Sequence, residues 1–238
     1  MALRKVRLFV GILVVYLVLG FLSWSIFSIL MRTDLLKVST IEITGINRLD
    51  EELVVAMGGV NPGVNIFSIR PWEIERRIER IPEVRKARVK KIFPRSVTIH
   101  IEERTPYALL VIADTGYCVD IDGVEIPCLP EEREELPRLW MDSYDTRWLL
   151  DGLEQMRLWK PDFTTPLLGI RVEDDRLFIL KLQNDIFIRS EGPQNLREKS
   201  DLLRPLLREV QVKALQVGGF DLRMQRDIVL IRSEGEVD

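Results

Sequence analysis

The feature that most constrains this chain is an uncharged, apolar segment close to its N-terminus. Residues 8–31 form a run of 24 residues without a charged side chain. A helix that rises about 1.5 Å per residue would carry such a segment across the ~30 Å hydrocarbon core of a bilayer. The alternative is a cleaved signal peptide, which has an apolar stretch of only about 7–15 residues and small residues at its cleavage site. The run here is longer and ends in Ile29, Leu30 and Met31, so the sequence predicts an uncleaved membrane anchor.

The charges on either side of this segment predict its orientation. Arg4, Lys5 and Arg7 precede it, and residues 32–37 contain both basic and acidic side chains. The positive-inside rule therefore predicts that residues 1–7 are cytoplasmic and that residues 32–238 lie on the other side of the membrane. The whole chain has a net charge of −3, and its first 31 residues contain basic but no acidic side chains. The large remainder is thus acidic on balance, which argues against a nucleic-acid partner.

The region after the anchor predicts one strand followed by two short helices. Alternating side chains predict a strand over residues 38–43, with Ile41 and Ile43 turned inward. Asp50 is a suitable N-cap for a short helix that ends at Gly58-Gly59. Pro71 is typical of a first helical position. The helix it begins carries one apolar stripe, made of Ile74, Ile78 and Ile81.

A β-hairpin is predicted next, with strands at residues 86–89 and 97–101. Basic and apolar residues alternate before the turn at residues 93–95, and apolar residues alternate again after it. We expect Val89 to pair with Ile101 on the buried face and Arg88 with Glu102 on the wet face, with a bulge or fraying near Lys91. The basic residues are then the solvated side of a sheet that two helices cover on its other side. The order of this region is β-α-α-β-β.

Beyond Pro106 the sequence predicts a second region of many short strands and two helices. Strands are expected at residues 109–112, 117–121, 124–126, 168–173, 176–182, 185–190, 215–224 and 227–232, and helices at residues 145–159 and 194–210. Turn signals lie at Asp174-Asp175 and Asn184-Asp185. The fold class is therefore α+β, with a single transmembrane helix, a β-α-α-β-β domain and then a mixed β-sheet domain with two helices. Residues 234–238 form an acidic tail.

Two cysteines, Cys118 and Cys128, flank a predicted turn at Asp122-Gly123. Outside the cytoplasm a disulfide is permitted. A three-residue loop would place the two cysteines opposite each other, whereas a two-residue loop would place Cys118 opposite Pro127. A metal site is disfavoured because no CxxC motif or histidine pair accompanies them.

A search for catalytic chemistry finds no constellation that supports an enzyme. The single histidine, His100, falls on the outer face of the predicted hairpin, where it would lack a partner as a metal ligand or catalytic base. No nucleotide, hydrolase or metalloprotease motif is present. Acidic residues such as Glu131 and Glu134 could supply a carboxylate pair, but they lie in a polar segment that is typical of a solvated loop. We therefore expect no enzyme activity, no cofactor, no metal and no small-molecule substrate.

The order of several sequence motifs resembles the FtsQ (DivIB) family of bacterial cell-division proteins. The matching segments are "IEITGINRL", "GVNIF", "IPEVRKARVKKIFPRSVTIHIEERTP", "YCVDIDGVEIP", "LPRLW" and "GGFDLRMQRDIVLIR". The resemblance implies a POTRA domain over residues 38–106 and the family's β-domain over residues 107–233. Pro82-Glu83-Val84 and Lys91-Ile92-Phe93-Pro94 stand where the family usually has an aromatic between proline and valine and an Arg-x-Trp-Pro turn.

The resemblance also implies a role and partners. The family acts as a single-pass scaffold of the division machinery, which binds FtsB and FtsL and, through them, the septal peptidoglycan synthase FtsW–FtsI; FtsK is a proposed upstream contact. In the family, the last strands of the β-domain receive FtsB. Carried over, the partner-binding residues are Phe220, Leu222, Arg223, Met224, Ile228, Val229, Leu230, Ile231 and Arg232. The family's aromatic residues after "DLR" and at the end of the last strand are replaced here by Met224 and Arg232.

Strand addition is the physical expectation for that surface. A last strand at a sheet edge offers unpaired N–H and C=O groups to the backbone of a partner. We expect charge reversal at Arg223 or proline at Val229 to abolish binding of an FtsB-like peptide.

Two other classes of protein compete with the scaffold. A POTRA-bearing transport or outer-membrane assembly component predicts a barrel of many strands of about ten residues each. A membrane-anchored cell-wall enzyme predicts a cleft with perturbed titratable groups. Too few residues follow Pro106 for the first, and the missing motifs argue against the second.

Overall fold

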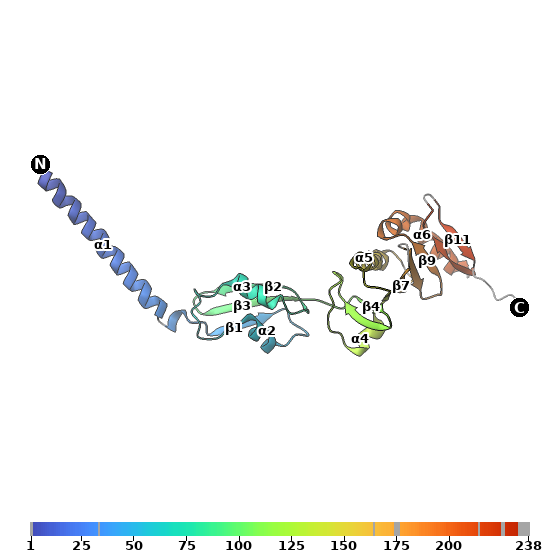
Figure 1. Ribbon diagram of the computed structural model, residues 1–238, viewed down its shortest axis with the longest axis horizontal. Helices are drawn as coiled ribbons and strands as arrows, with labels where there is room; N and C mark the ends of the chain where they lie inside the picture. Colours follow the sequence, from blue (N-terminus) through green and yellow to red (C-terminus); the bar gives the residue numbers. More distant parts are fainter. Residues whose placement is uncertain are drawn as a thin grey trace. The chain divides into compact units, whose positions relative to one another are not determined.

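The computed structural model describes residues 2–32, 34–163, 165–173, 177–213, 215–224 and 227–232. The chain divides into two compact units, Met1–Glu103 and Arg104–Asp238. Figure 1 labels the elements of both units, and each unit is described by itself below.

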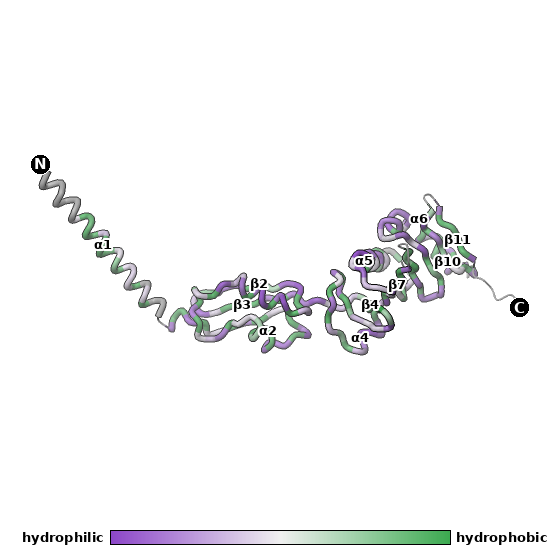
Figure 2. Tube along the Cα trace, in the orientation of Figure 1, coloured by the Kyte–Doolittle hydropathy of each residue, from purple (hydrophilic) through white to green (hydrophobic). Residues whose placement is uncertain are grey.

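Unit 1 begins with the long helix α1, Ala2–Arg32, followed by the 3-10 turn η1, Asp34–Leu36. The large apolar side chains described in α1 are exposed, Ile12, Phe21 and Trp24 among them, and Figure 2 shows the hydropathy along this helix. Among the residues that the structure describes, no helix is both long and apolar enough to cross a membrane.

The rest of unit 1 has the predicted β-α-α-β-β order. Its elements are β1 (Thr40–Thr44), α2 (Glu51–Gly58), α3 (Pro71–Ile78), β2 (Val84–Ile92) and β3 (Ser96–Glu103). The sheet order is β1-β3-β2, with β1 parallel and β2 antiparallel to β3. The predicted cap is confirmed, since Asp50 accepts a hydrogen bond from the Glu52 N–H and Gly59 ends α2 in the left-handed conformation. All three isoleucines of the predicted stripe of α3 are buried.

The predicted register of the hairpin is wrong by two residues. Val89 pairs with Ile99 instead of Ile101, and Arg88 pairs with His100 instead of Glu102. The turn lies at residues 93–95 as predicted, but the strands pair right up to it: Ile92 pairs with Ser96, which sets a register two residues from the one expected. A shift by two residues keeps every side chain on its predicted face, since the side-chain period of a strand is two. The irregularity lies between residues 84 and 86, at the far end from Lys91.

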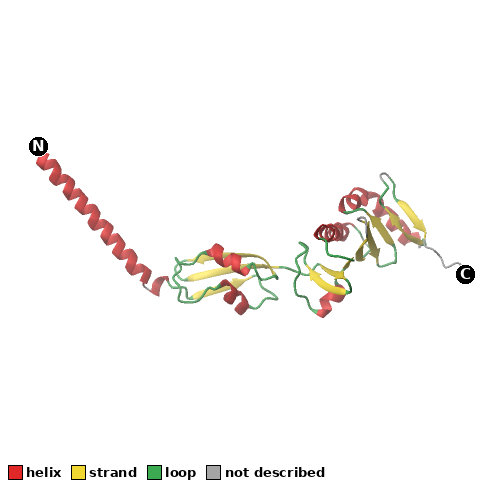
Figure 3. Ribbon diagram, viewed as in Figure 1, coloured by secondary structure: helices red, strands yellow, loops and turns green. Residues whose placement is uncertain are grey.

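Unit 2 is an eight-stranded mixed sheet with order β11-β10-β9-β8-β7-β6-β4-β5. The strands are β4 (Ala108–Ile112), β5 (Thr115–Val119), β6 (Arg138–Met141), β7 (Leu167–Glu173), β8 (Leu177–Leu182), β9 (Phe187–Ser190), β10 (Val217–Asp221) and β11 (Val229–Arg232). The helices are α4 (Pro130–Glu135), α5 (Thr146–Asp162) and α6 (Pro193–Lys213). Apolar residues of α5 and α6 pack with alternate residues of the strands in one core, so these two helices cover one face of the sheet (Figure 3).

Unit 2 confirms the helices that were predicted from residues 145 and 194, and it differs from the prediction in three places. The polar segment around residue 131 is a short helix, α4, so the described residues of the unit form three helices, one more than predicted. A central strand, β6, was not predicted. Residues 124–126 make an isolated bridge at Glu125 to β5 instead of a strand. The predicted turn at residues 174–175 lies outside the described residues.

The two cysteines form a disulfide, Cys118–Cys128. The bond joins β5 to the segment that follows the turn at Gly123, whose positive φ of 78° suits the glycine there. His100 is exposed, as predicted, and its Nδ1 lies 3.1 Å from the Thr44 hydroxyl.

Candidate partner-binding edge

The strand β11 lies at one edge of the eight-stranded sheet. It pairs antiparallel with β10, and among the described residues no strand lies on its other side. The register places Leu230 opposite Phe220 and Val229 opposite Asp221. The last strand therefore leaves one row of backbone groups unpaired within the sheet.

The direction of the backbone groups follows from the pairing of β10. The Leu222 N–H donates to the Arg189 carbonyl of β9 at 2.9 Å, so every second residue of β10, Phe220 included, faces β9. Phe220 and Leu230 then form a non-hydrogen-bonded pair, in which the N–H and C=O of Leu230 point away from β10. Val229, opposite Asp221, points its backbone groups toward β10. Leu230 is thus the residue of β11 that offers both a donor and an acceptor to the outside.

The side chains of the nine predicted site residues fall into three groups. Exposed side chains belong to Arg223, Met224, Val229, Leu230 and Arg232, and partly buried ones to Ile228 and Ile231. Phe220 and Leu222 are 1% and 0% exposed and belong to the core. The side chains that are at least partly exposed near β11 are therefore those of the other seven predicted residues.

A buried lysine of α6 holds the connection between β10 and β11. Lys199 is 5% exposed, and its Nζ donates to the carbonyl oxygens of Leu222, Met224 and Asp227. Asn195, one turn earlier, donates from Nδ2 to the Leu222 carbonyl at 2.8 Å. One ammonium group thereby fixes the path of the chain just before the edge strand. The prediction missed Lys199, although its position between Leu196 and Leu203 places it on the apolar stripe of the helix.

An ion pair supports the same connection from the strand side. Asp221 is 8% exposed, and its carboxylate accepts from the Arg223 guanidinium, with the shortest contact, from Nη2, at 2.6 Å. It also accepts from the Arg223 backbone N–H at 3.0 Å. The side-chain hydrogen bond from Arg223 lowers the pKa of Asp221 despite the opposing effect of burial. Charge reversal at Arg223 would therefore place two carboxylates together, and it tests the stability of the connection as much as binding.

The opposite edge of the sheet, β5, is partly covered. The Ile126 N–H donates to the Cys118 carbonyl at 2.9 Å, and the disulfide fixes the covering segment. Asp120 organises the turn, because its Oδ1 accepts from the N–H groups of Asp122 and Val124 at 3.0 and 2.8 Å.

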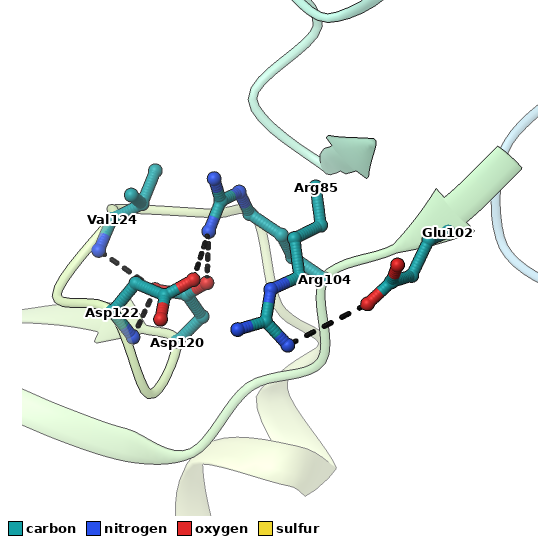
Figure 4. Close-up of polar contacts among 6 residues, drawn as sticks. All are labelled: Arg85, Glu102, Arg104, Asp120, Asp122 and Val124. Atoms are coloured by element: carbon teal, nitrogen blue, oxygen red, sulfur yellow. Dashed lines mark hydrogen bonds and ion pairs between the residues drawn. The ribbon is translucent and has the colours of Figure 1, made fainter. Parts of the chain in front are cut away.

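Arg104 adds ion pairs to Asp120 and Asp122 (Figure 4). The same view shows the separate ion pair Arg85–Glu102 of unit 1, at 3.6 Å. Within the part of the chain that the structure describes, no cluster of His, Cys, Asp and Glu could hold a metal ion. The open backbone of β11 is therefore the feature of unit 2 that best fits a binding role.

Comparison with known proteins identifies the class of unit 1. Residues 36–104 match the family model described as POTRA domain, FtsQ-type, so unit 1 contains a POTRA domain. The FtsQ of Geobacter sp. (strain M21) is 30% identical over 115 residues, and that of Syntrophotalea carbinolica is 31% identical over 125 residues. These matches cover 48% and 52% of this chain and 41% and 44% of the relatives.

A third relative, the cell division protein DivIB of Bacillus subtilis, is 30% identical over 98 residues, which is 41% of this chain and 37% of the relative. The chain is therefore similar, over about half of its length, to proteins named FtsQ and DivIB, and residues 36–104 match the FtsQ-type POTRA domain. It spans less than half of the length of the three relatives named here.

Proposed function

We propose that this protein is a scaffold of the bacterial division machinery that binds FtsB by strand addition at β11. FtsL joins through the same complex, and FtsW–FtsI, the septal peptidoglycan synthase, is recruited or regulated through these two partners. FtsK is the upstream contact. We assign the protein no catalytic step, cofactor, nucleic acid or small-molecule substrate.

The observation that carries the proposal is the outward-facing backbone of Leu230 on an edge strand. Around it the exposed side chains of Met224 and Val229 provide apolar contacts, and Arg232 provides a charge. Main-chain hydrogen bonds supply affinity in strand addition, and side chains on alternate positions supply selectivity. Interfaces favour methionine and arginine, which fits the residues that replace the family's aromatics here.

Membrane attachment is the second part of the proposal. The proposal uses the whole uncharged run of residues 8–31, several of whose side chains lie outside those that the structure describes. At about 1.5 Å per residue, a helix of this full run would cross the ~30 Å hydrocarbon core. The exposed apolar side chains of α1 would then face lipid. The basic residues before position 8 orient the chain with residues 1–7 in the cytoplasm and the POTRA domain and β-domain outside it. The proposed location is the inner membrane at the division septum.

The experiment uses a proline at the residue whose N–H faces outward. Leu230→Pro removes the donor that a partner strand needs, whereas proline at Val229 would break a bond to β10 and disturb the fold. We expect the full chain carrying Leu230→Pro to lose binding of an FtsB-derived peptide, with an unchanged circular dichroism spectrum. The matched control is Leu230→Ala, which shortens the side chain and keeps the N–H.

A crosslinking scan provides a second readout. A photo-reactive residue at position 230 should crosslink to FtsB in dividing cells, and one at Leu168, which is comparably exposed on β7, should not. Equal affinity of the proline and alanine variants, together with equal crosslinking at both positions, would refute strand addition at β11.

A further inference from the structure

The POTRA domain of unit 1 exposes apolar side chains at the end that lies next to α1. Between 38% and 65% of each of these side chains is exposed. We call this surface the apolar tip; it consists of Leu35, Val64, Phe67, Ile92 and Phe93. A small soluble domain rarely gathers exposed apolar groups in this way without a partner.

Three segments that are distant in sequence build the tip. The turn η1 contributes Leu35, and the loop before α3 contributes Val64 and Phe67. The end of β2 and the turn after it contribute Ile92 and Phe93. The rings of Phe67 and Phe93 lie with their centroids 5.3 Å apart. Both phenylalanines remain about half exposed despite this contact.

Backbone hydrogen bonds hold the three segments together. The Ile66 N–H donates to the Leu36 carbonyl and the Ser39 N–H to the Arg95 carbonyl, both at 2.8 Å, and the Val38 N–H donates to the Val64 carbonyl at 2.9 Å. The tip is therefore a fixed surface of the domain. Val38 and Ile66 of the same segments are buried, whereas the apolar side chains of the tip stay exposed.

The position of the tip along the chain points to what covers it. Helix α1 ends at Arg32, and Leu35 follows three residues later. Three residues span at most about 11 Å, so the tip stays close to the end of α1 whatever the angle between helix and domain.

The charges beside the tip fit a layer of phosphate groups. Lys91 and Arg95 flank the phenylalanine of the hairpin turn, and the Arg95 Nε donates to the Lys37 carbonyl at 3.2 Å. Lys37 lowers the pKa of Asp34 through its hydrogen bond and its charge, and the charge of Arg95 adds to this effect. Two nearby acids, Asp34 and Glu73, are paired with Lys37 and Arg70. Basic side chains can extend toward lipid phosphates while apolar neighbours enter the interface.

We propose that the apolar tip rests in the headgroup region of the bilayer that α1 crosses, so that the POTRA domain is docked on the membrane and not only tethered to it. This inference rests on the proposed membrane span of α1. An interfacial surface of this kind reaches about 5–10 Å into the boundary between headgroups and acyl chains. The tip would fix the direction in which the POTRA domain stands at the membrane.

The test reconstitutes the full chain in nanodiscs of phosphatidylethanolamine and phosphatidylglycerol. An environment-sensitive fluorophore is attached at Ser68→Cys, beside Phe67 and exposed; the native cysteines are joined to each other and do not react. The matched control label is at Arg80→Cys, which is exposed and precedes β2, the strand that runs for about 26 Å toward the tip.

We expect a lipid that carries a nitroxide near its headgroup to quench the label at position 68 and to leave the label at position 80 unaffected. The double variant Phe67→Ser/Phe93→Ser should reduce the quenching at position 68 at least twofold, while Leu53→Ser, an equally exposed change on α2, should leave it unchanged. Circular dichroism checks that each variant is folded.

Three outcomes would overturn the proposal. Equal, weak quenching at both positions in a chain that stays in the nanodisc would show a domain that is tethered but not docked. Quenching that persists in the double serine variant would show proximity without contact by the tip. A chain that fails to enter nanodiscs at all would overturn the docking and also the proposed span, which separates this failure from the first two.

Discussion

Replacing Lys199 by methionine should loosen the edge strand and leave the rest of the sheet intact. Methionine fills a similar volume without a charge, so Lys199→Met removes the ammonium that binds the carbonyls of Leu222, Met224 and Asp227. Hydrogen bonds to charged groups contribute about 1.5–3 kcal/mol each. Two effects reduce the total: the Leu222 carbonyl keeps its bond from Asn195, and a buried ammonium no longer has to be desolvated. We expect a local loss of about 2–3 kcal/mol.

Hydrogen exchange measures this loss where it arises. The N–H groups of Val229 and Ile231 face β10, so they exchange only when the β10–β11 pairing opens. A loss of 2–3 kcal/mol corresponds to exchange that is about 30-fold to 150-fold faster. Amides of β7 and β8, in the middle of the sheet, should keep their wild-type rates.

The control and the refuting results are equally specific. Lys213→Met removes an exposed lysine from the same helix, paired with Glu209, and should change exchange in β11 by less than about twofold. Unchanged exchange in β11 of Lys199→Met would show that the lysine does not hold the connection. Equal acceleration throughout β7, β8 and β11 would show a general loss of stability instead. Either result would refute the role of Lys199 in holding the connection. If exchange accelerates in β11 alone, the proposed binding of FtsB should also become weaker.

Three further perturbations test the two units. The Glu103 carboxylate accepts hydrogen bonds from three backbone N–H groups in the loop after β1. Burial alone would raise the pKa of Glu103, but these hydrogen bonds lower its pKa below the ordinary value near 4.5. Glu103→Gln should therefore destabilise unit 1 by about 1–2 kcal/mol at pH 7, and this difference should shrink as the pH falls below about 4.5, as measured by thermal unfolding. Gly169→Ala would bring a Cβ to 2.3 Å from a carbonyl oxygen of β6 and should destabilise unit 2 by about 1–3 kcal/mol, whereas Gly116→Ala meets only a flexible side chain at 3.2 Å and should cost much less. Reduction of Cys118–Cys128, which closes a short loop, should lower the stability of unit 2 by about 2–3 kcal/mol in urea titrations with and without reductant.

Local signals were sufficient for most elements of unit 1. A cap residue, a helix-starting proline and a left-handed glycine each act within a few residues, so Asp50, Pro71 and Gly59 could be interpreted without the rest of the fold. The hairpin shows where local reasoning ends. The two faces of the hairpin follow from the alternation of apolar and polar residues alone. Its register depends on the length of the turn, and the loop of residues 93–95 places every pair two residues from the predicted partner.

The missed features of unit 2 depend on distant partners. β6 has only four residues, which is too short for a periodic pattern, and it is stabilised by parallel pairing with β4 and β7 on either side. From the sequence alone, Lys199 is interpreted as a solvated charge. The Leu222 carbonyl that it binds lies 23 residues later in the chain. Phe220 and Leu222 were assigned to the partner surface through the family resemblance, and only the folded sheet shows that their side chains are buried in the core. Sequence located the edge region but not which of its residues face outward.

The other sheet edges bear on the proposal that β11 receives a partner strand. At the outer edge of the POTRA sheet, carboxylates of α3 occupy the free N–H groups of β2, since Glu79 accepts from Ala87 at 3.2 Å and Glu75 from Val89 at 2.8 Å. At β5 the disulfide-linked segment occupies part of the edge. These carboxylates and this segment block the addition of a strand from another chain, which an exposed edge would otherwise allow. No such cover lies on β11 among the described residues, although the run that includes Val229 and Leu230 is apolar and prone to association. An edge left open in a chain that covers β2 and part of β5 is expected if a partner strand normally occupies it.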